Sequence, residues 1–177
     1  EPIPFFGELG SVNPMFVLPH AASARGAEIG KGWAGSLAMG AGQFCTNPGI
    51  AVVGSGAAGD AFVKAATEAL AQVGPQVMLT DAIAAAYRDG QARFTARNAV
   101  RPLLSTQSEG REARPNLYET DAASYLQDHA LGEEVFGPLG LVIRVSGPAE
   151  MAHLARGFDG QLTATIHMDD ADLATAQ

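Results

Sequence analysis

The sequence predicts an α/β fold in which a mostly parallel sheet is covered by helices on both faces. Short apolar runs at 15–18, 50–53 and 141–145 have the length of strands that are buried on both sides. Segments with an apolar residue at about every fourth position lie between them, as in amphipathic helices. Strands that alternate with helices favour a parallel sheet. A chain of 177 residues is long enough to form one such domain with its own core.

The first part of the chain is expected to contain a loop, a strand and a helix. Residues 1–14 carry three prolines and two glycines, which favour irregular structure with Glu8 at its tip. A strand over 15–18 follows. Ser23 is a suitable N-cap for the helix after it. That helix has an apolar residue at every fourth position: Ile29, Trp33, Leu37 and Ala41.

Glycines end this helix and begin the loop QFCTNPG, which places Cys45 ahead of the strand at 50–53. Asp60 is a suitable cap for the next helix, which stops at a Gly-Pro pair. A strand over 76–79 and a helix over 80–97 are expected next. The apolar face of the Asp60 helix consists of Phe62, Ala66, Leu70 and Val73.

The second half of the chain is expected to hold shorter elements. Residues 98–121 are irregular, with extended segments at 103–106 and 116–120. A short helix from Asp121 leads into the loop GEEVFGPLG. The last expected elements are a strand over 141–145, a helix over 148–156 that has proline at its first position, and a strand over 162–167.

Composition and charge exclude several classes of partner. The net charge is −8 and the eleven lysines and arginines are scattered, so the sequence predicts no nucleic-acid surface. The apolar runs are shorter than the roughly 20 residues that a membrane span requires. The amino terminus lacks the basic and hydrophobic regions of a signal peptide. We therefore expect no membrane partner and a soluble, cytoplasmic protein.

Cys45 is the only cysteine, so the chain cannot form an internal disulfide. One cysteine with dispersed histidines does not have the paired spacing of a zinc site, and no metal is expected. An isolated cysteine is most often a small buried apolar residue. The histidines are expected at the surface or in packing positions: His20, His129, His153 and His167.

The segment GSGAAG offers a second candidate site, because Gly54, Gly56 and Gly59 form a G-x-G-x-x-G pattern after a predicted strand. Backbone N–H groups in such a loop can bind a dinucleotide pyrophosphate, with an acid such as Asp81 on a ribose hydroxyl. A chain with 21 glycines also produces such patterns in ordinary loops, and Thr80-Asp81 fits a helix cap equally well. The residues themselves leave both interpretations open.

Three separated segments resemble the signature segments of the aldehyde dehydrogenase catalytic domain. They are GELGSVNP at 7–14, GQFCTNPG at 42–49 and EEVFGPLG at 133–140, in the family's order and with similar spacing. Within the family, the nearest resemblance is to 2-oxoglutarate semialdehyde (2,5-dioxopentanoate) dehydrogenases, with bacterial fatty aldehyde dehydrogenases as near relatives. The resemblance implies the aldehyde dehydrogenase catalytic-domain fold and NAD(P)-dependent oxidation of an aldehyde to a carboxylic acid.

The resemblance also implies roles for individual residues. Cys45 would be the nucleophile that forms a thiohemiacetal and then a thioester, with its backbone N–H on the oxyanion. Glu8 would be the general base that activates water for thioester hydrolysis. Glu134 would bind hydroxyls of the nicotinamide ribose, and Phe136 would pack beside that ribose. The cofactor would be NADP or NAD.

Phe44 and Thr46 flank the nucleophile and are expected to line the substrate pocket. Ser11 and Val12 stand where the family more often has Gly and Lys, which points to the semialdehyde branch. A substrate carboxylate would need a cation, and the sequence does not choose between four arginines: Arg88, Arg93, Arg97 and Arg101.

Residues 1–177 are expected to be the catalytic domain of a longer protein. The family's Rossmann-type cofactor domain lies mostly upstream of this segment, and its oligomerisation tail lies downstream. The parent is expected to be a homo-oligomer and this segment to be inactive by itself. Two other hypotheses remain: a free-standing dinucleotide-binding module that uses the Gly54–Gly59 loop, and a noncatalytic folded fragment.

Overall fold

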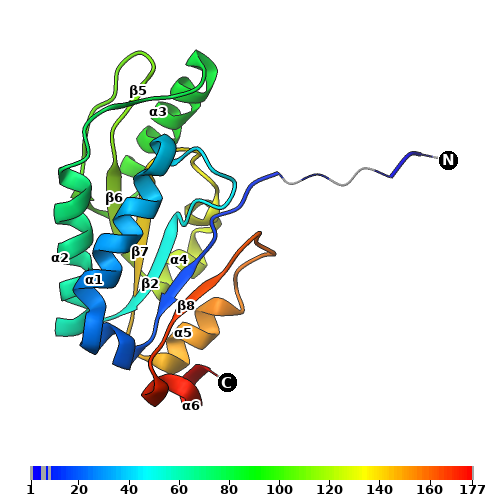
Figure 1. Ribbon diagram of the computed structural model, residues 1–177. Helices are drawn as coiled ribbons and strands as arrows, with labels where there is room; N and C mark the ends of the chain where they lie inside the picture. Colours follow the sequence, from blue (N-terminus) through cyan, green and yellow to red (C-terminus); the bar gives the residue numbers. More distant parts are fainter. Residues whose placement is uncertain (1, 5–6, 8, 177) are drawn as a thin grey trace.

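The computed structural model describes residues 2–4, 7 and 9–176. Its main feature is a six-stranded sheet with helices on both faces (Figure 1). One edge strand is antiparallel to its neighbour, and every other adjacent pair is parallel. This arrangement confirms the predicted mostly parallel sheet. Across the sheet the strands are β4 (Arg101–Leu104), β6 (Asn116–Asp121), β7 (Leu139–Val145), β2 (Ile50–Gly54), β1 (Met15–Val17) and β8 (Thr165–His167).

Two long helices, α1 (Pro19–Ala38) and α2 (Ala57–Ala71), cover one face of the sheet. The other face is covered by α3 (Asp81–Thr95), α4 (Ala122–Gln127) and α5 (Pro148–Ala155). A separate antiparallel pair is formed by β3 (Gln76–Val77) and β5 (Glu112–Ala113). Short helical turns complete the fold: η1 (Met39–Gly42), η2 (His129–Gly132), η3 (Asp170–Asp172) and α6 (Leu173–Ala176).

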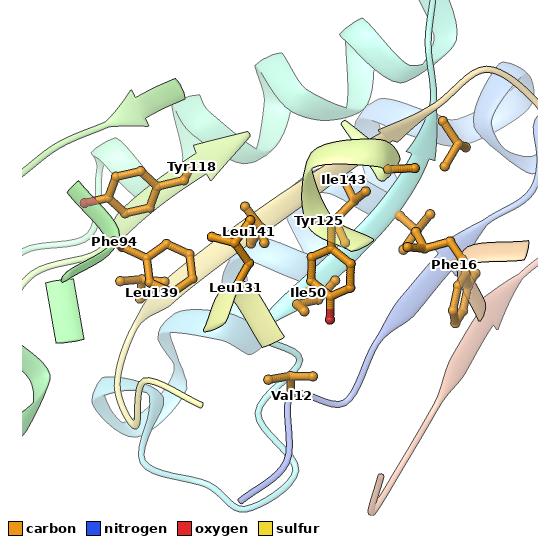
Figure 2. Packing of buried hydrophobic residues seen from close by; sticks show 14 of the residues in the cluster. Val12, Phe16, Ile50, Phe94, Tyr118, Tyr125, Leu131, Leu139, Leu141 and Ile143 are labelled. Carbon is orange, nitrogen blue, oxygen red and sulfur yellow. The ribbon is translucent and has the colours of Figure 1, made fainter. Parts of the chain in front are cut away.

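Alternation along the strands separates two cores. In β2, Ile50 and Val52 pack in the cluster under α3–α5, whereas Ala51 and Val53 pack under α1 and α2. Successive side chains of a strand point to opposite faces, so a strand with both faces buried has a continuous apolar sequence. Figure 2 shows the cluster under α3–α5, to which Tyr125 of α4, Leu131 of η2 and Leu141 of β7 belong.

Helices α1 and α2 cross at very short range because glycine occupies the crossing point. A Cβ added at Gly30 would collide with the Phe62 carbonyl, and one at Gly26 would lie 3.0 Å from Ala58 O. The Trp33 ring packs beside the Phe62 ring at a centroid distance of 5.7 Å. Gly26 and Gly30 therefore let the two helix backbones approach closely enough for the Trp33 and Phe62 rings to pack against each other.

Several predicted boundaries were wrong by a few residues. Helix α1 begins at Pro19 rather than at Ser23, and its non-helical residue, Arg25, follows Ser23 by two positions. Helix α2 begins at Ala57 with Gly56 as N-cap, so Asp60 lies in its first turn, where it pairs with Arg144. Helix α3, by contrast, is capped by the Thr80 side chain, as predicted.

Within the residues that the structure describes, no helix combines the length and the apolar character needed to cross a membrane.

The short crossing of α1 and α2 gives a testable prediction. Gly30→Ala is expected to lower the free energy of unfolding by about 1–3 kcal/mol, because its methyl group must displace the α2 backbone. Gly32→Ala, on the same helix with open space around it, is expected to raise that free energy by up to about 1 kcal/mol. Urea unfolding measures both, and a Gly30→Ala protein as stable as the parent would contradict this packing.

A buried carboxylate joins the two ends of the fold. Asp172 is fully buried and accepts hydrogen bonds from the N–H groups of His20 (3.0 Å) and Ala21 (3.0 Å) in the first turn of α1. The Asp169 N–H donates to it as well, at 3.1 Å. Burial alone would raise the pKa of Asp172, but these donors outweigh it and hold the pKa below its ordinary value.

This carboxylate makes stability depend on pH. The pKa of Asp172 in the folded protein lies below the unfolded value of roughly 3.9. The ionised carboxylate therefore stabilises the fold at pH values above the unfolded pKa, and this stabilisation is lost as the pH falls through the folded pKa. Asp172→Asn is expected to cost about 1–3 kcal/mol at pH 7 and progressively less below about pH 4. Asp170→Asn, at an exposed site, is the control for urea unfolding at each pH. A constant Asp172→Asn deficit would contradict the linkage.

Candidate active site

Three segments that are distant in the sequence meet at one edge of the sheet. Residues 9–13 precede β1, residues 43–49 precede β2 and residues 133–138 precede β7. These three strands are neighbours and parallel, so the segments before them arrive at the same amino-terminal edge. Parallel pairing alone therefore brings together the three segments that carry the sequence resemblance.

A small cavity of about 30 Å³ lies where the three segments touch. Ser11 lines it from the first segment, Asn47 from the second, and Glu134 and Phe136 from the third. A Cβ added at Gly10 would lie 3.3 Å from Glu134 Oε2, so the third segment packs directly on the first. Glu8, the expected general base, lies outside the described residues.

Cys45 lies at the tip of a tight turn. The Asn47 N–H donates to Phe44 O at 3.0 Å, which makes Cys45 and Thr46 the two central residues of a β-turn. The thiol is exposed, and so are both of its neighbours. Such a turn presents the thiol to the solvent side of the sheet edge, where a substrate can reach it.

The base of this turn is held by buried polar contacts. Asn47 Nδ2 donates to Leu37 O at 3.0 Å and to Gly42 O at 3.1 Å, which ties the turn to the end of α1. The indole N–H of Trp33 donates to Pro48 O at 2.7 Å. The loop therefore has an exposed tip and a fixed base, an arrangement suited to a reactive side chain.

Asn13 connects the first segment to the Cys45 turn. Its Nδ2 donates to Cys45 O and to Asn47 O, both at 2.9 Å. Asn13 is 2% exposed and has a φ of 45°, a left-handed conformation that asparagine tolerates better than most residues. A buried amide with all its groups bonded is therefore part of the support of Cys45.

Glycines allow the second and third segments to approach each other closely. Gly42 has a φ of 67°, and an added Cβ would collide with the backbone of Gly137. Gly137 in turn packs against the Tyr87 ring of α3. Burial raises the pKa of Tyr87 above its ordinary value, so its hydroxyl stays protonated and donates to Arg114 O at 2.6 Å.

The predicted site residues occupy two different positions at this edge. Glu134 and Phe136 are half-buried and line the cavity between the segments. Phe44 and Thr46 are exposed on the outside of the turn, where Phe44 is 47% exposed and its ring covers Gly40. The structure therefore groups Glu134 and Phe136 in the cavity and Phe44 and Thr46 beside the thiol.

The arginines considered for a substrate carboxylate have other partners. Arg97 pairs with Asp128, and Arg101 pairs with Glu119 at 2.7 Å. Arg88 donates to Gly110 O. None of these three, nor the exposed Arg93, lines the cavity as the described residues form it.

The GSGAAG loop lies at the opposite, carboxyl-terminal edge of the sheet. Gly56 has a φ of 98° and precedes α2, and an added Cβ at Gly59 would collide with Gly54 O, so local geometry explains both glycines. Asp81 is in the first turn of α3, with a side chain 91% exposed and 3.8 Å from Arg111. It follows β3, which lies outside the main sheet. The acid is therefore not on a strand beside the glycine loop.

The side chains that support the Cys45 turn from the protein interior were not predicted from the sequence. Asn13 and Gln161 were not predicted, although the Asn-Pro pair at 13–14 was a signal for a turn. Trp33 was predicted only as a core residue. Within the part of the chain that the structure describes, no group of three or more acidic, histidine or cysteine side chains is arranged to hold a metal.

The curated proteins that are similar to the chain include two semialdehyde dehydrogenases. The chain is 38% identical over 179 residues to alpha-ketoglutaric semialdehyde dehydrogenase 2 of Azospirillum brasilense. It is 36% identical over 180 residues to alpha-ketoglutaric semialdehyde dehydrogenase of Acinetobacter baylyi. All of the chain aligns in both cases, but it spans only 34% of each relative. No protein-family model matches the sequence.

Solved structures show the same fold. The NAD-dependent benzaldehyde dehydrogenase of Corynebacterium glutamicum aligns with a TM-score of 0.77 over 96% of this chain and 37% of its own, at 22% identity. The NADP-dependent glyceraldehyde-3-phosphate dehydrogenase of Bacillus halodurans, complexed with NADP, aligns with a TM-score of 0.76 over 96% and 36%, at 22% identity. Over its whole length the chain is therefore similar to part of two semialdehyde dehydrogenases, and it has the fold of the corresponding part of solved aldehyde dehydrogenases.

Proposed function

We propose that the chain is the nucleophile-bearing domain of an NAD(P)-dependent aldehyde dehydrogenase, which oxidises an aldehyde to a carboxylic acid. The observation that carries the proposal is the convergence of three segments at one sheet edge. An exposed cysteine on a tight turn and a half-buried carboxylate on a neighbouring loop lie at that edge together. The names of the relatives support the same reaction class.

Cys45 is the proposed nucleophile. Its thiolate attacks the aldehyde carbon and gives a thiohemiacetal, whose oxyanion can accept a hydrogen bond from the Cys45 backbone N–H. In a β-turn the hydrogen bond that closes the turn comes from the fourth residue, here Asn47, so it does not use that amide. Collapse of the adduct expels a hydride and leaves a thioester on Cys45.

Glu8 is the proposed general base for the second half of the reaction. It would remove a proton from water, and the resulting hydroxide attacks the thioester carbonyl. The products are the carboxylic acid and the free thiolate of Cys45. The support for this role is the position of Glu8 in the segment that leads to Asn13, whose amide holds the Cys45 turn.

Glu134 and Phe136 fit the ribose end of a nicotinamide dinucleotide. Glu134 supplies an accepting carboxylate and Phe136 a half-buried ring on the same loop, at the edge that carries Cys45. A carboxylate that accepts bonds from both hydroxyls of a ribose fixes its orientation. When bound, NAD or NADP supplies the acceptor for the expelled hydride, and the similar solved structures include an enzyme of each kind.

The proposed substrate is a semialdehyde of the kind named in the two relatives, 2-oxoglutarate semialdehyde. Phe44 and Thr46 would line its approach, because both are exposed beside the thiol. We further propose that a Rossmann-type cofactor domain and an oligomerisation tail of the parent protein lie outside this chain. The supporting observation is that the relatives are about three times as long.

Burst kinetics in the full-length protein test the two-step mechanism. Cys45→Ser is expected to abolish both the initial burst of NAD(P)H and steady-state turnover. Glu8→Gln is expected to retain a burst of about one NAD(P)H per site and to lose steady-state rate by roughly 10²–10⁴-fold, because hydrolysis loses its base. Lys31→Ala, at an exposed position of α1, is the control. Steady-state turnover that persists in Cys45→Ser would contradict the nucleophile.

Substitution of two acidic residues tests whether the dinucleotide binds at the proposed cofactor site or at the glycine loop. Glu134→Gln is expected to weaken NAD(P) binding by roughly 10–100-fold, because a charged acceptor is lost. Asp81→Asn removes a 91% exposed carboxylate and is expected to leave the affinity unchanged. Fluorescence titration of the full-length protein measures both constants. The opposite result, with only Asp81→Asn impaired, would support a dinucleotide site at Gly54–Gly59.

A further inference from the structure

A polar cluster joins the segment before β8 to the segment before β1. It consists of Ser11, Asn13, Gln161 and Thr163, and it is called the Gln161 cluster below. Ser11 and Asn13 are 4% and 2% exposed, so their polar groups must be satisfied inside the protein. The sequence prediction gave residues 162–167 as one strand, but β8 begins only at Thr165. The residues before it bond to side chains instead.

Gln161 acts almost entirely as an acceptor. Its Oε1 accepts hydrogen bonds from Val12 N at 2.7 Å, Ser11 Oγ at 3.0 Å and Asn13 N at 3.2 Å. Its Nε2 makes one longer bond, to Asp159 O at 3.3 Å. Without Gln161, two backbone N–H groups and one hydroxyl of the first segment would lose this acceptor.

Asn13 connects Gln161 to the turn that carries Cys45. Its Oδ1 accepts from the N–H and hydroxyl of Thr163 at 3.1 and 3.0 Å. It also lies 2.9 Å from Ser11 Oγ, whose single proton is shared between Asn13 and Gln161. The two Thr163 donors on Oδ1 fix which end of the amide points to them, so Nδ2 must face the other way. That face is where the carbonyls of Cys45 and Asn47 lie. A continuous path of hydrogen bonds thus runs from Gln161 through Asn13 to Cys45.

Ser11 bonds on both sides of the cluster. Its hydroxyl also accepts from Leu162 N at 3.1 Å, so it bonds on both sides of the junction. Before β8 begins, the two loops that flank the proposed site are therefore joined by side-chain hydrogen bonds and not by strand pairing.

We propose that Gln161 is a positioning residue for Cys45, acting through Asn13. This inference rests on the proposed function. Gln161 lies on a loop at the rim of the fold, is only half-buried and is bonded to the segment that carries the proposed base. Its loss would let the 11–13 segment and the Cys45 turn shift relative to each other. A displacement of about 1 Å can lower a catalytic rate by about 10²-fold.

The test compares variants of the full-length protein. Gln161→Ala is expected to lower kcat by about 10–100-fold with KM for the aldehyde within about twofold of the parent value. Gln161→Glu keeps an oxygen that can accept the same three bonds, and is expected to recover kcat to within about threefold. Ser11→Ala removes one bonded hydroxyl and is expected to give a smaller loss. Asp159→Ala, on the same loop, is the control.

Peptide-resolved alkylation of Cys45 by iodoacetamide provides a readout that does not need turnover. Gln161→Ala is expected to change the alkylation rate of Cys45 by at least about threefold across pH 6–9, and Gln161→Glu to restore it. Equal rates in Gln161→Ala and the parent, or a Gln161→Glu variant no better than Gln161→Ala, would overturn the positioning role. If Gln161→Ala does not fold, Ser11→Ala is compared with the parent, and an unchanged alkylation rate of Cys45 would overturn the positioning role. Absence of dehydrogenase activity in the parent would overturn the proposed function alone, because alkylation still tests the positioning.

Discussion

Parallel pairing of β1, β2 and β7 is the constraint on which the proposed site depends. Met15 pairs with Ala51, and Ile50 pairs with Leu141, so all three strands begin at nearly the same level. Each strand is preceded by a loop, and the three loops come from residues that are roughly 35 to 125 positions apart. No local structure could place them together. The two buried faces of the sheet fix this register, because a one-residue slip would move every apolar side chain to the wrong core.

Pairing brings the loops to one edge, but buried amides hold them in a defined arrangement. Asn13 and Asn47 are 2% and 9% exposed. Asn13 donates to the carbonyls of Cys45 and Asn47, and Asn47 donates to the carbonyls of Leu37 in α1 and of Gly42. A buried carbonyl without a donor is costly, so these contacts select one conformation of the turn. The hydrogen bonds at the base of the loop offset the free-energy cost of burying the two amides. The tip that carries the thiol remains exposed and can meet a substrate.

The fold was largely predictable because its strands and helices have strong local patterns. Continuous apolar runs predicted β1, β2 and β7, and Thr80 and Asp121 predicted two helix caps that the structure contains. The shortened β8 was not predictable from its own residues, because its first part bonds to Ser11 and Asn13 across the fold. Glu134 and Phe136 could be proposed from a motif, whereas Gln161 carries no motif. Its contacts exist only because two distant loops meet.

We propose that Cys45 forms the covalent intermediate at this sheet edge. Mass spectrometry of the full-length protein after brief incubation with NAD(P) and 2-oxoglutarate semialdehyde tests it most directly, and the Glu8→Gln variant allows the intermediate to accumulate. We expect one acyl group on the peptide that contains Cys45, released by hydroxylamine as expected of a thioester. An acyl group on another residue, or turnover with no adduct in either protein, would contradict it.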